Sequence, residues 1–323
     1  MPDVPLLEVR DLVKQFSARP GGRRTVTAVD GVAFDLRPGE TLGLVGESGS
    51  GKSTIGKLVT RLLRPDRGEI RLAGRDISTL SGRAMRPFRR DVQLVFQDPY
   101  SSLNPRHTVG DILGTALRVH DTVPRSQVAH RIRELLGQVG LDPAHAGRYP
   151  HEFSGGQRQR IGIARALAVG PRLIVADEPV SALDVSIQAQ VMNLLEDLRA
   201  ELGLAFLFIS HDLAVVRHFC DRVAVLYMGR IVEIGAREQI YADPRHPYTQ
   251  TLMAAVPDIA WLRGGSPRRI RVPSASPVAA EAGAQRSGCR FRARCPVAAP
   301  VCASSEPALT LRAGGHRAAC HIR

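Results

Sequence analysis

The chain has 323 residues, of which 44% are hydrophobic, and this composition is typical of a globular protein rather than of a disordered one. Its apolar stretches, such as 204–209 and 223–227, are far too short to span a bilayer, and residues 1–10 lack the pattern of a signal peptide. We therefore expect a protein that stays in the cytosol.

The net charge of +13 could indicate nucleic-acid binding, but its source argues against that function. Only three residues of the chain are lysine, so arginine supplies nearly all of the positive charge, as a GC-rich coding sequence would produce without selection for DNA contact. Residues 260–323 hold eleven arginines and two acidic residues. A solvated basic tail, an anionic membrane surface and a nearby group of thiolates are the alternatives for this segment. We expect no nucleic-acid partner.

The first part of the chain predicts strands followed by a glycine-rich loop and a helix. Residues 6–13 and 26–36 have strand-like patterns, with a turn at Gly21-Gly22 between them. Residues 40–45 predict a short buried strand that leads into the glycine-rich loop, and residues 52–63 predict a helix.

The pattern then changes twice along the chain. Between about 100 and 150 it predicts a helical insertion, with helices at 109–119 and 128–140. After the insertion, strand-like runs at 173–176, 205–209 and 222–226 alternate with helical runs at 157–168, 187–202 and 213–219. This alternation predicts an α/β protein whose mainly parallel sheet is covered by helices on its faces.

The glycine-rich loop fits the pattern G-x-x-x-x-G-K-[ST] without a departure, and it lies between a predicted strand and a predicted helix. Its glycines let backbone N–H groups converge on phosphate oxygens, and the start of the helix adds partial positive charge. We predict that Lys52 binds the β- and γ-phosphates and that Ser53 binds Mg²⁺. The predicted nucleotide-binding residues of this loop are Gly46, Glu47, Ser48, Gly49, Ser50, Gly51, Lys52, Ser53 and Thr54.

Two carboxylates follow the apolar run at 172–176, where the carboxyl end of a strand would bring them to the ligand edge of the sheet. Asp177 is predicted to hold the Mg²⁺ shell, and Glu178 to polarise the attacking water as general base. The alternative is that both carboxylates only begin a solvated loop.

A second glycine-rich helix start, Phe153-Ser-Gly-Gly-Gln-Arg158, makes the family recognisable. It resembles the signature sequence of the ABC ATPases, whose usual first residue is Leu rather than Phe. The resemblance implies that Ser154, Gly155, Gly156 and Gln157 of one subunit close over the ATP held by another subunit, so that dimerisation is part of catalysis.

Further positions match this family in chain order. Gln97 matches the residue that senses Mg²⁺ near the transmembrane partner, Ser181 and Asp184 match the segment that communicates across the dimer, and His211 matches the switch histidine. Phe16 matches the aromatic residue that stacks on adenine, and a core residue is the less favoured alternative. The resemblance thus implies Mg²⁺ ligation by Ser53, Gln97 and Asp177, and catalysis by Lys52, Gln97, Glu178 and His211.

The tail holds four cysteines with the spacing C-x5-C-x6-C-x17-C, at Cys289, Cys295, Cys302 and Cys320. Disulfides are disfavoured in the cytosol, and the tight pair typical of structural zinc is missing. A metal, an iron–sulfur cluster and free thiols remain the alternatives. We expect the arginines around these cysteines to lower the pKa of the thiols. The fifth cysteine, Cys220, is predicted to be a buried hydrophobic residue.

The tail, His246-Pro-Tyr248 and the run from Gln97 to Pro105 resemble the ATPase subunits of oligopeptide and dipeptide importers. The resemblance implies an ABC ATPase domain at 1–255 with a helical subdomain at about 100–165, and a C-terminal extension at 256–323 that carries a [4Fe-4S] cluster in some members. It implies an ATPase that uses ATP and Mg²⁺ to power import of di- or oligopeptides at the cytoplasmic face of a bacterial membrane.

The partners implied are two permease subunits, a second and distinct ATPase subunit, and indirectly a solute-binding protein. Nickel, glutathione and other small solutes are alternative cargoes, and a redox role of the cysteine tail is an additional one. An ABC ATPase acting on DNA or ribosomes is disfavoured, because the chain has neither a long coiled coil nor a second cassette.

Overall fold

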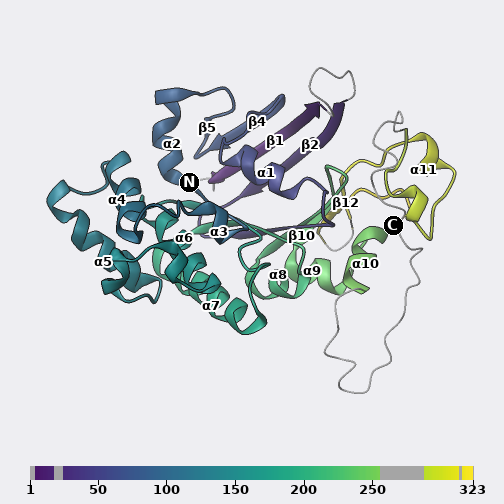
Figure 1. Cartoon of the computed structure of the whole chain (residues 1–323). Coiled ribbons are helices and arrows are strands. Elements are labelled where there is room, and N and C mark those ends of the chain that lie inside the picture. Colours follow the sequence, from purple (N-terminus) through teal and green to yellow (C-terminus); the bar gives the residue numbers. More distant parts are fainter. Residues whose placement is uncertain (1–3, 18–24, 255–286, 313–314, 323) are drawn as a thin grey trace.

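The computed structural model describes residues 4–17, 25–254, 287–312 and 315–322. The turn expected at Gly21-Gly22 lies outside these residues. Within them, strands form two sheets and helices cover their faces (Figure 1). No helix in this part of the chain combines the length and the apolar character needed to cross a membrane.

The smaller sheet is antiparallel and has the strand order β2-β1-β4-β5. Its strands are β1 (Leu7–Ser17), β2 (Thr25–Leu36), β4 (Arg67–Leu72) and β5 (Arg75–Asp76). The inward residues of these strands pack with helix α1 (Lys52–Val59) and with one face of the larger sheet in a single apolar cluster.

The larger sheet has the order β11-β12-β10-β9-β3-β8-β7-β6, and its neighbours β9-β3-β8-β7-β6 are parallel. These strands are β3 (Thr41–Val45), β6 (Val92–Val95), β7 (Leu173–Asp177), β8 (Ala205–Ser210) and β9 (Arg222–Tyr227). Strands β3, β7 and β8 are buried along their whole length, as is typical of a parallel sheet covered on both faces. The parallel sheet predicted from the sequence is therefore confirmed.

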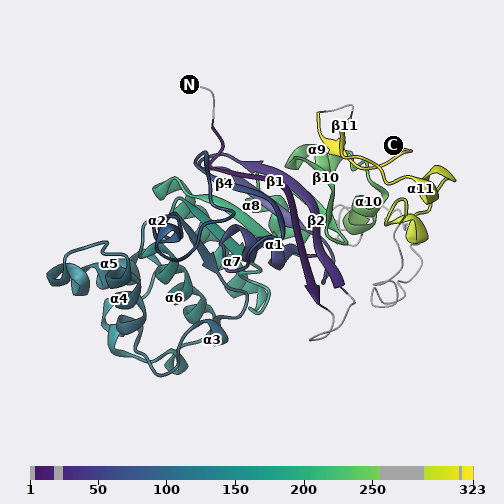
Figure 2. The same cartoon turned by 90° about the horizontal axis from the view of Figure 1, so that it is seen from above.

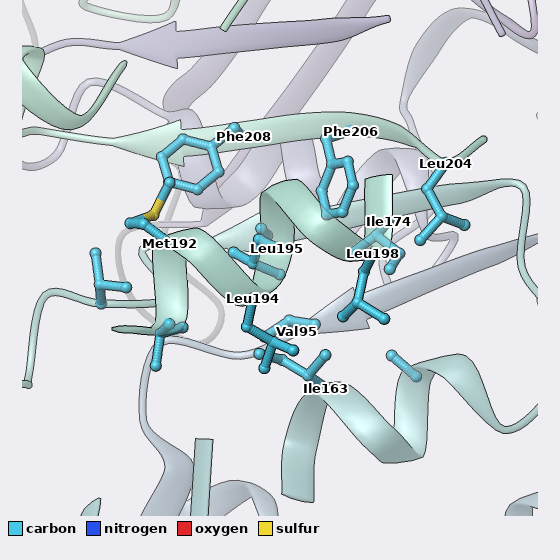
Figure 3. Packing of buried hydrophobic residues seen from close by; sticks show 14 of the residues in the cluster. Val95, Ile163, Ile174, Met192, Leu194, Leu195, Leu198, Leu204, Phe206 and Phe208 are labelled. Atoms are coloured by element: carbon cyan, nitrogen blue, oxygen red, sulfur yellow. The ribbon is translucent and has the colours of Figure 1, made fainter. Parts of the chain in front are cut away.

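Helix α7 (Val185–Leu202) covers the other face of this sheet, and Figure 3 shows its apolar side against the strands. Met192 and Leu195 point toward Phe206 and Phe208 of β8. Helix α8 (Leu213–Phe219) completes this layer, where Phe219 meets both phenylalanine rings of β8 at 5.0 and 5.3 Å between centroids.

The helical insertion lies at one end of the molecule, away from the C-terminal residues, in both views (Figures 1 and 2). Its longer helices pack on one another, and short helices precede it. The helices of this region are α2 (Arg86–Asp91), α3 (Pro99–Ser102), α4 (Val109–Val119), α5 (Val128–Gln138) and α6 (Gly155–Leu167). The helix expected at 52–63 ends at Val59, because Arg61 has the left-handed φ of 57°, which does not continue a helix. The buried guanidinium of Arg61 donates to three backbone carbonyl oxygens.

The C-terminal residues return to the larger sheet. Strand β12 (Arg317–Ala318) pairs with β10 (Arg230–Ala236), and β11 (Thr310–Leu311) pairs with β12. Between them lie α9 (Arg237–Ala242), α10 (Pro247–Ala254) and α11 (Val301–Ser304). We call residues 287–322, apart from 313–314, the extension. It adds strands to the edge of the cassette's own sheet, so its fold depends on that sheet.

Candidate nucleotide-hydrolysis site

The glycine-rich loop lies between β3 and α1, where backbone crowding explains two of its glycines. Gly51 has φ 107°, and a Cβ there would lie 2.3 Å from the Ala28 carbonyl oxygen. A Cβ on Gly46 would lie 2.2 Å from the Leu226 carbonyl oxygen. Contacts this short are not tolerated, so only glycine fits both positions. The loop therefore keeps its backbone exposed to a ligand.

Lys52 begins α1 and is 4% exposed. Its Nζ donates to the carbonyl oxygens of Gly46 (2.7 Å) and Glu47 (3.0 Å). Burial lowers the pKa of Lys52, and the charges of Glu178, Asp177 and Glu47 oppose this shift. The ammonium group is thus held inside the loop by carbonyl oxygens that phosphate oxygens could replace.

Ser53 and Asp177 meet at the carboxyl end of β7. The Ser53 hydroxyl donates to Asp177 Oδ1 at 2.8 Å. Burial raises the pKa of Asp177, which is 7% exposed. A hydroxyl and a buried carboxylate side by side, with the Gln97 amide across the same cavity, are oxygen donors of the kind that Mg²⁺ takes beside phosphates. These residues therefore fit the ion predicted from the sequence.

Glu178 follows in a strained backbone conformation with φ 47°. Its N–H donates to the Ile209 carbonyl oxygen of β8 at 2.9 Å, which fixes this conformation. Its Oε2 accepts from Gln97 Nε2 at 3.0 Å and lies 3.0 Å from His211 Nδ1. The structure thus brings together three side chains that are far apart in the sequence.

These groups surround one cavity of about 470 Å³ beside the loop. It is lined by Ala28, Ser48, Gly49, Gly51, Lys52, Ser53, Thr54, Gln97, Glu178 and His211. Residues of the glycine-rich loop, with Lys52, line it together with a carboxylate, an amide and an imidazole. This arrangement can bind a phosphate chain and hold a water molecule against its end.

The signature residues do not line this cavity. Ser154 caps helix α6 and forms a capping box with Gln157, with N–H···O distances of 3.0 and 3.3 Å. A Cβ on Gly156 would lie 2.4 Å from Ile187 Cγ2, so α6 and α7 approach closely there. Phe153, the departure from the usual signature, is buried and packs edge-on against His145.

Three further predicted residues lie outside the cavity as well. Phe16 is the last residue but one of β1 and is 40% exposed, and the Lys14 ammonium lies 5.6 Å from the centre of its ring. The Ser181 hydroxyl donates to the Glu178 carbonyl oxygen at 3.1 Å, and Asp184 precedes the first turn of α7. The adenine and dimer roles of these residues stay predictions.

The four tail cysteines lie in the extension, where the Cys289 N–H donates to the Cys302 carbonyl oxygen at 2.8 Å. Across the described residues, no three His, Cys, Asp or Glu side chains converge closely enough to hold a metal ion. The thiols in this arrangement therefore do not form a ligand set for a cluster. Cys220 is buried as predicted, and burial raises the pKa of its thiol.

The expectation that arginines lower the thiol pKa values is wrong for Cys289. Burial raises the pKa of this thiol, and the neighbouring thiols of Cys302, Cys295 and Cys320 add to the shift. The nearby arginines are engaged elsewhere: Arg290 pairs with Asp30 and Glu306, and Arg294 pairs with Glu47. Sequence reasoning missed this last contact with the glycine-rich loop, because no local pattern links the two residues.

Two family models match the chain. Residues 29–181 match the model described as "ABC transporter", and residues 232–302 match "Oligopeptide/dipeptide transporter, C-terminal region". The chain is 50% identical to the oligopeptide transport ATP-binding protein AppF of Bacillus subtilis, over 98% of this chain and 97% of that protein. It is 51% identical to a putative peptide import ATP-binding protein of Brucella ovis, over 99% of this chain and 98% of that protein.

Solved structures agree with this likeness. A dimeric ATP-binding cassette in a post-hydrolysis state with ADP and Pi superposes with a TM-score of 0.64 at 29% identity, over 72% of this chain and 98% of that one. CbiO1 from Clostridium perfringens, part of an ABC transporter complex, superposes with a TM-score of 0.66 at 27% identity, over 80% of this chain and 99% of that one.

Proposed function

This chain belongs to the ABC transporter family as an ATP-binding subunit, and we propose that it hydrolyses ATP to drive import of di- and oligopeptides. One observation carries the proposal: Glu178, Gln97 and His211 meet beside a phosphate-binding type of loop, in a chain whose residues 232–302 match the oligopeptide/dipeptide transporter C-terminal region. The names of the relatives with 50% and 51% identity support the same cargo class.

In the proposed reaction, the loop amides and Lys52 bind the phosphates, and Ser53, Asp177 and Gln97 hold Mg²⁺. The metal neutralises charge on the β- and γ-phosphates when it is bound. Glu178 accepts a proton from the attacking water, and His211 and Gln97 fix the orientation of its carboxylate. Phe16 is proposed to stack on the adenine ring.

A second ATPase subunit completes the site in this proposal. The cavity is not lined by the chain's own Ser154, Gly155, Gly156 and Gln157, so these residues are free to act on nucleotide held by a partner. Ser181 and Asp184 would communicate across that interface. We propose that the partner is a related but distinct subunit, because importers of this kind commonly pair two ATPases.

Subunits of this family work with transmembrane permeases, and we propose two of them here, together with a solute-binding protein that delivers the peptide. The permeases would dock beside Gln97 and the helical insertion at about 100–150, on the cytoplasmic face of a bacterial membrane. Exposed aromatic residues at that place support the proposal: Phe96 is 38% exposed and Tyr100 is 63% exposed, with the Arg158 guanidinium 4.0 Å from the Tyr100 ring.

We further propose that residues 1–255 form the ATPase domain, and that the extension within 256–323 holds a [4Fe-4S] cluster on Cys289, Cys295, Cys302 and Cys320. Burial raises the pKa of Cys289, and the thiols of Cys302, Cys295 and Cys320 lie near enough to raise it further. This nearness supports the proposal, and the four thiols would have to move closer together to bind one cluster. We expect anaerobic purification to give a brown protein with about four irons per chain. Stoichiometric zinc in a colourless protein, or no metal at all, would reject the cluster.

Peptide uptake tests the cargo. In cells that carry Glu178→Gln in place of the native chain, with the partner ATPase subunit kept and the ATPases of other peptide importers deleted, we expect uptake of one class of labelled di- or oligopeptide to be lost. Wild-type complementation should restore it. Unchanged peptide uptake with loss of glutathione or nickel uptake would support the alternative cargoes. Glutathione is included because the chain is 57% identical to a glutathione import ATP-binding protein of Shigella dysenteriae, over 78% of this chain and 41% of that protein.

A further inference from the structure

The extension reaches the phosphate-binding loop directly. Both Nη atoms of Arg294 donate to the Glu47 carboxylate, at 2.8 and 2.9 Å. The Glu47 N–H donates to the hydroxyl oxygen of Tyr248, in α10, at 2.8 Å. The second residue of the loop is therefore held through its side chain and its backbone by groups more than 200 residues away in the sequence.

The neighbours of Arg294 fix its position. Its guanidinium carbon lies 5.6 Å from the centre of the Phe291 ring and 6.0 Å from that of Tyr227. Both rings also pack with Tyr248, at centroid distances of 5.5 and 4.5 Å. The two rings beside the guanidinium, themselves packed on Tyr248, restrict its freedom, which favours the bidentate contact with the carboxylate.

A second arginine of the extension supports the same loop from its other end. Arg290 donates to the Met228 carbonyl oxygen at 2.6 Å and pairs with Asp30. The adjacent Gly229 N–H donates to the Ser50 carbonyl oxygen of the loop at 2.8 Å. The extension thus contacts Glu47 at the start of the loop, and it also contacts the turn at Met228-Gly229 that holds Ser50 further along the loop.

The charge of Glu47 matters for the ligand. It reaches Lys52, since Glu47 is among the charges that raise the pKa of this lysine. The side chains of Arg294 and Glu47 are only 18% and 33% exposed, so water screens their charges incompletely. Without Arg294, a carboxylate would stand uncompensated beside a phosphate chain of several negative charges.

We propose that Arg294 is a positioning residue for ATP, which neutralises Glu47 and holds the first turn of the phosphate-binding loop in its binding form. The inference rests on the proposed function, and it assigns the extension a direct effect on nucleotide affinity. Among the described residues, the hydrogen bonds and ring contacts of Arg294 go to Glu47, Tyr227 and Phe291, and not to Glu178, Gln97 or His211. Its loss should consequently act on binding rather than on the chemical step.

Calorimetric titration of the full purified chain with MgATP tests the proposal. We expect Arg294→Ala to raise the Kd for ATP about tenfold, with a larger effect at low salt, and to change kcat at saturating ATP by less than about twofold. Arg294→Gln, which keeps part of the aliphatic chain and a hydrogen-bond donor, should also raise the Kd for ATP. Arg294→Lys, which keeps the charge but not the two-pronged guanidinium, should raise the Kd for ATP about threefold.

The decisive variant is the double change Arg294→Ala with Glu47→Gln. If the cause is the uncompensated charge, removing that charge should restore the Kd to within about twofold of Glu47→Gln alone. If Arg294 only docks the extension, the double variant should bind ATP as weakly as Arg294→Ala, and the proposal is overturned. Arg317→Ala, an exposed arginine of strand β12, is the matched control and should bind like the wild type.

The two ideas fail in different ways. A wild-type chain that does not bind MgATP counts against the proposed function itself. Wild-type binding together with an unchanged Kd in Arg294→Ala counts only against the role of Arg294. Melting temperatures of each variant show whether it is folded. If Arg294→Ala does not fold, Arg294→Gln and the double change Arg294→Gln with Glu47→Gln repeat the test.

Discussion

Glu178→Gln is expected to lower kcat for ATP hydrolysis by about 10² to 10⁴-fold while the Kd for ATP changes by less than about twofold. Glutamine has the shape of glutamate but cannot accept the proton of the attacking water. Glu178 follows strand β7 and is not part of the glycine-rich loop, so the contacts that bind phosphate should persist. Phosphate release measures kcat, and calorimetric titration measures the Kd.

The hydrogen bonds of Glu178 explain why no other residue should take over its role as the base when it is replaced. Its Oε2 is the point at which Gln97 and His211 meet, each at 3.0 Å. Asp177, the neighbouring carboxylate, is bonded to Ser53 instead and is buried. No other carboxylate among the residues that line the described cavity can take the proton.

Glu196→Gln is the matched control for this prediction. Glu196 also faces a histidine, with 3.4 Å between its Oε1 and His218 Nε2, but on the surface of α7 and α8. We expect this variant to keep wild-type kcat. A Glu178→Gln chain that hydrolyses ATP within tenfold of the wild type would show that another group is the base.

The sequence predicted the parallel sheet and its strands β3, β7, β8 and β9 because these strands are continuous apolar runs, but it predicted neither their order in the sheet nor β6. It did not predict β4 or β10, where charged residues such as Arg71 and Glu233 interrupt the apolar pattern. Glu233 is fully buried there, accepting from the N–H groups of Arg245 and His246 at 2.6 and 2.9 Å. A buried carboxylate satisfied by backbone from another element is invisible to local periodicity.

Motif spacing located the candidate site for a related reason. Asp177 and Ser210 end neighbouring parallel strands, so the residues that follow them, Glu178 and His211, must emerge at the same edge. The bond between Arg294 and Glu47 has no such rule behind it. It depends on how the extension folds back across β10, and the sequence pattern suggested only that its arginines would face the thiols.

Lys52→Ala is expected to weaken ATP binding about 100-fold and to reduce hydrolysis with it. The buried ammonium group can form several charge-assisted hydrogen bonds with phosphate oxygens, and alanine removes them all. In the described structure this ammonium is satisfied by the carbonyl oxygens of Gly46 and Glu47. Exchanging these two neutral acceptors for charged phosphate oxygens is favourable, and alanine cannot make the exchange. Titration with MgATP measures the Kd.

The loop itself should survive the change, because its shape depends on glycines and on backbone contacts rather than on Lys52. Gly46 and Gly51 are packed against the carbonyl oxygens of Leu226 and Ala28, and the Ser50 carbonyl is held by Gly229. Lys57→Ala, on the exposed side of the same helix, removes one positive charge without reaching the cavity, and should bind ATP like the wild type. Equal losses in the two variants would mean that net charge, and not the position of the ammonium group, governs binding.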